Sequence, residues 1–133
     1  KLLLKTQPEL HIVTAHPEMN GFYGSKGVSG WIPSVYAAAA TDFMERHATQ
    51  KGHRLYEYRR KPPATFHAKG IWTNDLTFIG SSNLGYRSQH RDLEASLVLH
   101  TSNASMRHQL LHERQRIFSP ATPIPSPQHY LNS

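Results

Sequence analysis

The stretch TFHAKGIWTNDLTFIGSSNLGYRSQHRDLEASLVL, Thr65 to Leu99, decides the fold because it alternates short apolar runs with turn-prone residues. The runs TFHAKGIW and LTFIGS flank the tripeptide Thr73 to Asp75, whose residue types favour a turn. This arrangement predicts an antiparallel hairpin. A further strand is expected over Asp92 to His100, where β-branched and leucine residues return.

The hairpin is expected to gather polar side chains at one place. Side chains two apart on a strand share a face, so His67 and Lys69 should project together while Phe66 packs on the opposite face. The antiparallel return should carry Ser81 and Asn83 back to the beginning of the first strand. An imidazole, an ammonium, a hydroxyl and an amide then converge.

This set of side chains suits a phosphoryl group. Lys69 would neutralise its charge, while Ser81 and Asn83 would donate hydrogen bonds to its oxygens. The His67 imidazole can attack phosphorus or transfer a proton. Glu94, on the following strand, is expected to accept a hydrogen bond from the far nitrogen of His67 and hold its tautomer. A His and a Lys two apart on a strand are more often a solvated face, so only the combination argues for catalysis.

Outward from this stretch, the chain reads as an α/β domain with a mixed sheet flanked by helices. The expected further elements are a buried strand over Leu10 to Pro17, a helix over Ile32 to Gln50, a strand over His53 to Arg59 and an amphipathic helix over Ser105 to Phe118. The 133 residues have room for one domain of ordinary size. We place that domain at residues 1–118, with the motif-bearing stretch at 65–99.

The first helix and its surroundings carry three further expectations. The helix should pack through one face formed by Val35, Tyr36, Ala39 and Phe43. The glycine-rich segment 20–30 before it should lack regular structure and let backbone approach a ligand, with Lys26 as a phosphate-binding charge. The alternative for that segment is a flexible loop. The proline-rich residues 119–133 are predicted to form a disordered tail.

Composition limits the class of partner. Lys and Arg number 15 against 9 Asp and Glu, and ten histidines add to the positive charge as they protonate, which favours an anionic partner such as phosphate, nucleic acid or acidic lipid. A solvated basic surface is the alternative. There is no cysteine, so no disulfide framework or thiolate metal site is available. No apolar run reaches the roughly 20 residues of a spanning helix, and the absence of an initiator Met suggests that the sequence begins inside something longer.

The HxK pair at His67 and Lys69, the GSxN at 80–83, and Glu94 eleven residues after Asn83 resemble the HKD motif of the phospholipase D superfamily. The blocks NGFYGSKGVSGWIPSVY, TFHAKGIW and GSSNLGYRSQHRDLEA resemble the C-terminal half of the eukaryotic phosphatidylglycerophosphate synthases, over roughly residues 10–118. The sequence departs from the general motif at one position, where Asn74 replaces an Asp and Asp75 stands beside it.

The resemblance implies phosphatidyl transfer from CDP-diacylglycerol to glycerol-3-phosphate, with CMP as the other product. Two HKD motifs would meet at one site without a metal or other cofactor; one histidine would form a phosphohistidine and the other, here His67, would act as acid and base. Lys69, Asn83 and Glu94 would complete this motif. The partner motif would come from a missing N-terminal half or a second copy of the chain. The resemblance also implies peripheral association with the mitochondrial inner membrane and no nucleic-acid partner.

Three alternatives remain. A nuclease or phosphodiesterase of the same superfamily would use the same residues on nucleic acid, and turnover of CDP-diacylglycerol against cleavage of DNA would distinguish the two. A catalytically idle binding half is the second alternative, against which stands the complete set of His67, Lys69, Asn83 and Glu94. A basic nucleic-acid module of another fold is the third, but no binding motif of that kind is visible.

Overall fold

The structure, a computed structural model, describes residues 9–48, 52–60, 65–82 and 90–130. These residues form two compact units, one comprising the chain up to Phe66 and again from Ile117, the other comprising His67 to Arg116. The elements are β1 (His11–Ala15), η1 (Pro17–Met19), η2 (Gly27–Trp31), α2 (Ile32–Phe43), η3 (Met44–Ala48), β2 (Arg54–Tyr58), β3 (Gly70–Trp72), β4 (Leu76–Gly80), β5 (Ser96–His100), α4 (Ala104–Phe118), β6 (Ala121–Pro123) and η4 (Pro127–Tyr130).

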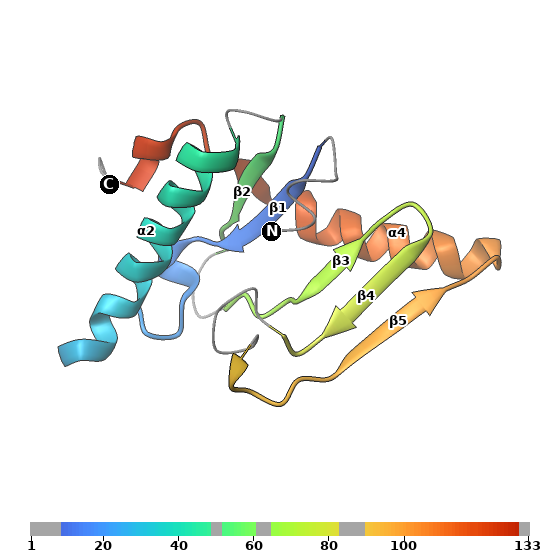
Figure 1. Ribbon diagram of the computed structural model, residues 1–133, viewed down its shortest axis with the longest axis horizontal. Helices are drawn as coiled ribbons and strands as arrows, with labels where there is room; N and C mark the ends of the chain where they lie inside the picture. The colour runs from blue at the N-terminus through green and yellow to red at the C-terminus, as the bar shows by residue number, and fades with distance from the viewer. Residues whose placement is uncertain (1–8, 49–51, 61–64, 83–89, 131–133) are drawn as a thin grey trace. The chain divides into compact units, whose positions relative to one another are not determined.

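Each unit contains a three-stranded sheet (Figure 1). In the first unit β2 is central, parallel to β1 and antiparallel to β6. In the second unit β4 is central and antiparallel to both β3 and β5. The predicted α/β class is therefore confirmed, but the strands divide between a mixed sheet and an antiparallel sheet instead of forming one.

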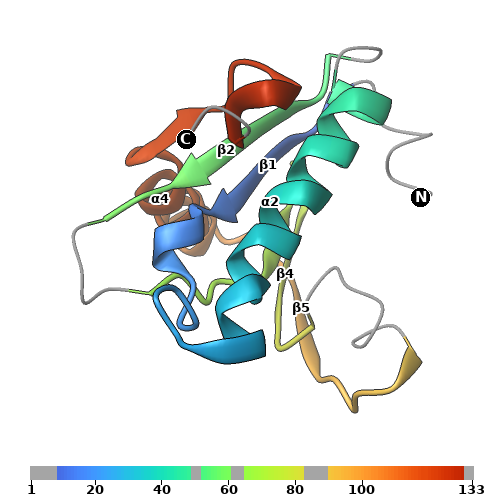
Figure 2. The ribbon, with the colours of Figure 1, turned by 90° about the vertical axis from the view of Figure 1, so that its left-hand side faces the viewer.

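The core of the first unit lies between α2 and the β1–β2–β6 sheet. Its buried members are Met44, Leu55 and Ile124, and the partly buried Ile12, Ala40 and Phe43 pack against them. Figure 2 shows α2 in front of β1 and β2, as this packing requires. Burial of these side chains removes apolar surface from water, which is the main favourable term in holding the helix to the sheet.

The helix predicted from Ile32 is confirmed, but the face predicted to pack is only partly right: Phe43 packs against the core, whereas Val35, Tyr36 and Ala39 do not. Val35 and Tyr36 are exposed, whereas Pro33, Ala40 and Met44 are turned inward. Pro33 and Met44 are buried and Ala40 is partly buried; the three positions are spaced by seven and four residues, so they lie on one side of the helix. Apolar residues occur all round the first turns of α2, and periodicity therefore could not select the packed side.

The glycine-rich segment is not entirely irregular, contrary to the prediction. Gly27 has φ 74°, a left-handed conformation that glycine adopts without steric cost, and it begins the short 3-10 helix η2. Phe22 donates its backbone N–H to the Asn20 side chain at 2.9 Å, which closes a turn before Gly24. Glycines therefore set the turn without excluding a helical segment after it.

The predicted disordered tail is also corrected. Ala121 to Pro123 pair with β2 as an edge strand, and the Ile124 N–H donates to the Leu55 carbonyl at 2.9 Å. Pro123 is tolerated because it lies on an edge strand, and Pro127 stands first in η4, where its missing N–H costs little. The prolines thus lie at positions where proline is tolerated, so the proline content of the segment did not imply disorder.

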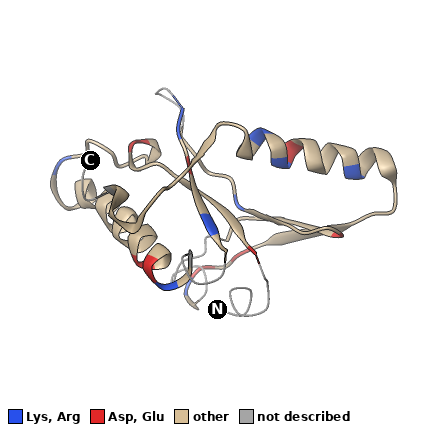
Figure 3. Cartoon of the chain, turned by 90° about the horizontal axis from the view of Figure 1, so that it is seen from above, with Lys and Arg blue, Asp and Glu red and all other residues tan. Residues whose placement is uncertain are grey.

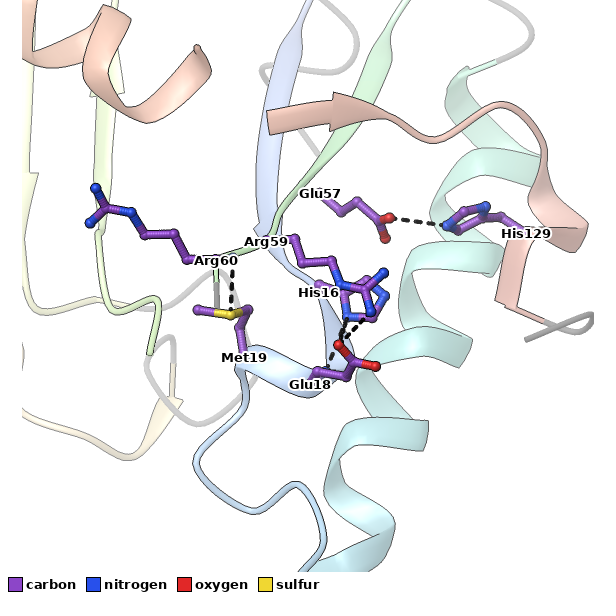
Figure 4. Close-up of polar contacts among 7 residues, drawn as sticks. All are labelled: His16, Glu18, Met19, Glu57, Arg59, Arg60 and His129. Atoms are coloured by element: carbon purple, nitrogen blue, oxygen red, sulfur yellow. Dashed lines mark hydrogen bonds and ion pairs between the residues drawn. The ribbon is translucent and has the colours of Figure 1, made fainter. Parts of the chain in front are cut away.

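A buried carboxylate ties the end of this segment to the sheet. Glu57 on β2 is only 7% exposed, and its Oε1 lies 3.2 Å from Nε2 of His129 on η4 (Figure 4). A buried carboxylate needs such a partner, because an unpaired charge in the interior is costly.

Phe66 packs, as predicted. On the same strand as Glu57, Tyr58 stacks on Phe66 with ring centroids 4.8 Å apart.

α4 matches the predicted surface helix. The Asn103 side chain accepts from the Met106 N–H at 3.1 Å and so caps its first turn. None of its described side chains is buried, and it carries charges of both signs (Figure 3). Near its end, Phe118 lies edge-on to Tyr56 with centroids 5.7 Å apart.

Candidate active site

The polar residues of the motif gather at one end of the β3–β4–β5 sheet. Because both pairings are antiparallel, the start of β3, the end of β4 and the start of β5 meet at the same end (Figure 1). Gly80 donates its N–H to the Lys69 carbonyl at 3.2 Å, and Ser81 donates its N–H to the Ala95 carbonyl at 3.0 Å. Lys69, Ser81 and the Glu94–Ala95 segment are therefore neighbours.

His67 and Lys69 do not lie on a strand, in contrast to the prediction. β3 begins at Gly70, and both residues precede it. Among the described residues, the bond from the Gly80 N–H to the Lys69 carbonyl is the last backbone hydrogen bond that joins the β3 and β4 segments at this end. His67 therefore lies beyond the paired part of the chain. The two residues are still coupled, because the Lys69 ammonium donates to the His67 carbonyl at 2.9 Å. His67 is exposed and Lys69 is half-buried.

Ser81 and Glu94 form the most closely connected pair. The Ser81 hydroxyl donates to Oε2 of Glu94 and accepts the Ala95 N–H at 3.1 Å. The hydroxyl therefore fixes the position of the carboxylate relative to the start of β5. Ser81, predicted to bind phosphate, thus has a partner that was not predicted. A Gly-Ser pair at the end of one strand and a Glu just before the start of its neighbour permit this bond.

The predicted hydrogen bond between His67 and Glu94 is not present in the structure. The His67 imidazole makes no hydrogen bond within residues 9–48, 52–60, 65–82 and 90–130. An exposed ring attached beyond the last ladder bond is free to turn about its side-chain torsions. The role of Glu94 in orienting His67 thus remains a hypothesis.

Gly80 is required by the approach of β5. A Cβ atom built at Gly80 would lie 2.9 Å from the Ala95 carbonyl oxygen and closer still to the Ser96 side chain. Real Cβ atoms do not approach backbone oxygen so closely, so any other residue would push β4 and β5 apart. The glycine before Ser81 therefore keeps Ser81 within reach of Glu94.

Two further residues were predicted to take part in the site, Asn83 and Lys26. Asn83 lies outside the described residues. Lys26 is exposed in the first unit, whereas His67, Lys69, Ser81 and Glu94 belong to the second. In the described part of the chain, no group of three or more His, Cys, Asp or Glu side chains is arranged to hold a metal ion.

Comparison with known proteins gives one consistent name. The chain is 42% identical over 127 residues to the human mitochondrial CDP-diacylglycerol-glycerol-3-phosphate 3-phosphatidyltransferase, matching 88% of this chain and 23% of the human protein. It is 38% identical over 128 residues to a Dictyostelium discoideum protein named as a probable enzyme of the same kind, and 34% identical over 131 residues to the Schizosaccharomyces pombe enzyme.

These curated relatives are much longer than the chain. The matched region takes in 89% of this chain but 22% of the Dictyostelium protein, and 93% of this chain but 26% of the S. pombe protein. The chain therefore spans about a quarter of the length of the relatives that it matches. No protein-family model matches the sequence.

The fold is similar to that of a solved enzyme. The crystal structure of phosphatidylserine synthase from Haemophilus influenzae Rd KW20 matches with a TM-score of 0.82 over 96% of this chain and 30% of that chain, at 21% identity. At this level of identity the similarity concerns the fold alone. The predicted phospholipase D-like α/β fold is confirmed by it.

Proposed function

We propose that this chain supplies part of the active site of a phosphatidyltransferase that moves a phosphatidyl group from CDP-diacylglycerol to glycerol-3-phosphate. One observation carries the proposal: Lys69, Ser81 and Glu94 converge at one end of a sheet within a segment that is 42% identical to an enzyme of that name. The same group of side chains suits any phosphoryl transfer, and the sequence identity is the reason to propose this one. Location at the mitochondrial inner membrane is part of the proposal.

In this mechanism a histidine attacks the phosphorus that bears the diacylglycerol group, and the bond from that phosphorus to the CMP oxygen breaks. A second imidazole protonates the leaving CMP oxygen, then removes the proton from the glycerol-3-phosphate hydroxyl as that oxygen attacks the phosphorus of the phosphohistidine and the P–N bond breaks, which frees the first histidine. We assign His67 the second role. Its exposure at the end of the sheet leaves it accessible to both the leaving group and the acceptor.

The other residues stabilise charge. The Lys69 ammonium lies next to the His67 main chain, where it can balance the negative charge that develops on the phosphoryl oxygens. Asn83 would donate hydrogen bonds to the same oxygens. Ser81 holds Glu94, and we propose that Glu94 meets the imidazole when His67 turns inward on binding substrate, since catalytic hydrogen bonds often tighten only in the complex.

The mechanism requires two imidazoles, and this chain carries one HxK motif. The other comes either from another part of a longer protein or from a second copy of the chain. A partner motif approaching the end of the sheet where β3 begins would face His67. Lys26 would bind a substrate phosphate from the glycine-rich segment.

The test is an assay of CMP release from CDP-diacylglycerol with glycerol-3-phosphate, using the complete protein that contains this chain and buffers with a metal chelator. Formation of phosphatidylglycerophosphate should depend on His67. Cleavage of DNA by the same preparation without CDP-diacylglycerol turnover would favour the nuclease alternative. Binding of CDP-diacylglycerol without any turnover would favour an idle binding half.

A further inference from the structure

An apolar surface on the first unit remains exposed to solvent. Its members are the large hydrophobic side chains of the glycine-rich segment and of the start of α2, which we call the aromatic face: Phe22, Tyr23, Val28, Trp31 and Val35. Val28 is 84% exposed and Trp31 is 73% exposed. Grouped exposed hydrophobic residues of this size mark interaction sites.

The geometry of α2 sets this face apart from the core. Trp31 and Val35 are four residues apart and share one side of the helix, and Val28 precedes Trp31 by three residues in η2. Pro33 and Ala40 lie about 200° and 180° away from Trp31 at 100° per residue, on the side that packs toward the sheet. The helix is therefore apolar on two opposite sides, and only one of them is used by the fold.

Charge identifies what could cover this face. From Asn20 to Thr41 the sequence contains a single charged side chain, the exposed Lys26. The acidic residues that border the segment are neutralised: Glu18 lies 2.6 Å from the Arg59 guanidinium (Figure 4), and Asp42 lies 2.7 Å from that of Arg46. The aromatic face thus presents one uncompensated positive charge among aromatic and aliphatic side chains.

We infer that the aromatic face inserts into the interface of a bilayer that contains anionic phospholipids. Trp and Tyr prefer the level of the headgroups, where the ring is in an apolar environment and the polar atom meets water. Lys26 would meet a lipid phosphate, consistent with a phosphate-binding role. Among the described residues, no helix is long and apolar enough to span a membrane.

The inference deepens the proposed function, because the acyl chains of CDP-diacylglycerol lie in the bilayer that this face would enter. In Figures 1 and 2 the first turns of α2 extend beyond the ends of β1 and β2. An insertion at that end of α2 leaves the β1–β2–β6 sheet in water. The core contacts of Ala40 and Met44, on the opposite side of α2, need not change.

The experiment measures binding of the complete protein to sedimenting vesicles of phosphatidylcholine, with and without phosphatidylglycerol. The double variant Val28→Ser with Trp31→Ser should weaken binding by at least about tenfold, given the transfer free energy of the two side chains. The control, Met106→Ser with Leu111→Ser, changes two apolar residues on α4 that are exposed, though less so than Val28 and Trp31, and it should bind as the unaltered protein does. Lys26→Gln should lose about fivefold on anionic vesicles only.

Turnover of a short-chain CDP-diacylglycerol below its critical micelle concentration separates the two proposals. The Val28 and Trp31 variant should retain this activity, which shows that it is folded. Unaltered protein without such activity would refute the proposed function and leave the binding result intact. Unchanged vesicle binding by the variant would overturn the inference. A change in the molecular mass of the variant in solution, in place of a loss of vesicle binding, would also overturn it, because the face would then contact a second copy or another part of the protein.

Discussion

Replacement of Ile124 by alanine tests whether the C-terminal segment is part of the core. The Ile124 side chain is only 5% exposed and packs with Met44 and Leu55. The substitution removes three carbons, and at about 0.8 kcal/mol for each buried methylene the transfer term is about 2.4 kcal/mol. The cavity left behind adds to this, so we expect the free energy of unfolding to fall by about 3 kcal/mol.

Urea unfolding followed by circular dichroism measures this loss. Leu93→Ala is the matched control, since it also removes three carbons but at a fully exposed side chain, and it should change the free energy of unfolding by less than about 0.5 kcal/mol. Hydrogen exchange of the Ile124 amide, which donates to Leu55, should quicken in the Ile124 variant. A change in the free energy of unfolding no larger than that of Leu93→Ala would refute the packing of this segment against β2.

The remaining predictions concern catalysis. In the complete protein, His67→Ala should abolish phosphatidyl transfer with unchanged circular dichroism, because its exposed ring contributes little to packing; near-normal turnover would reject its role. Glu94→Gln should reduce the rate substantially but less than His67→Ala, since an amide occupies the same space but stabilises an imidazolium poorly. Ser81→Ala should reduce the rate less than Glu94→Gln, because it removes one hydrogen bond to the carboxylate but keeps the carboxylate itself; a larger effect would point to direct contact with phosphate. The 133-residue chain alone should release no appreciable CMP, since it supplies one HxK motif, and robust activity from a proven monomer would contradict the two-motif mechanism.

Local signals predicted the hairpin because its turn is stabilised within a few residues. The Thr73 hydroxyl accepts from the Leu76 N–H at 2.9 Å, and the Thr73 N–H donates to the Leu76 carbonyl at the same distance. This chemistry is readable from the tripeptide itself. The approach of Ser81 to Lys69 followed from the hairpin, and that of Glu94 from the antiparallel pairing of β5 with β4.

Features that depend on distant residues were not predictable in the same way. The inward side of α2 is selected by Leu55 and Ile124, which lie outside the helix, so Val35 and Tyr36 were assigned to the wrong side. The proline-rich segment is folded because the open edge of β2 provides hydrogen-bond partners. Neither feature can be predicted from amino-acid composition, because each depends on which surface of the folded chain packs against the segment.

The strand order β1–β2–β6 has a consequence for synthesis on the ribosome. β2 ends at Tyr58, but the strand that covers its free edge begins at Ala121, 63 residues later. At about 5–20 residues per second, that edge waits roughly 3–13 s for its partner. During this interval β1 and β2 present an unpaired edge, the kind of template on which nascent chains aggregate. The first unit should therefore be the part of the nascent chain most dependent on chaperones, until β6 and Ile124 emerge.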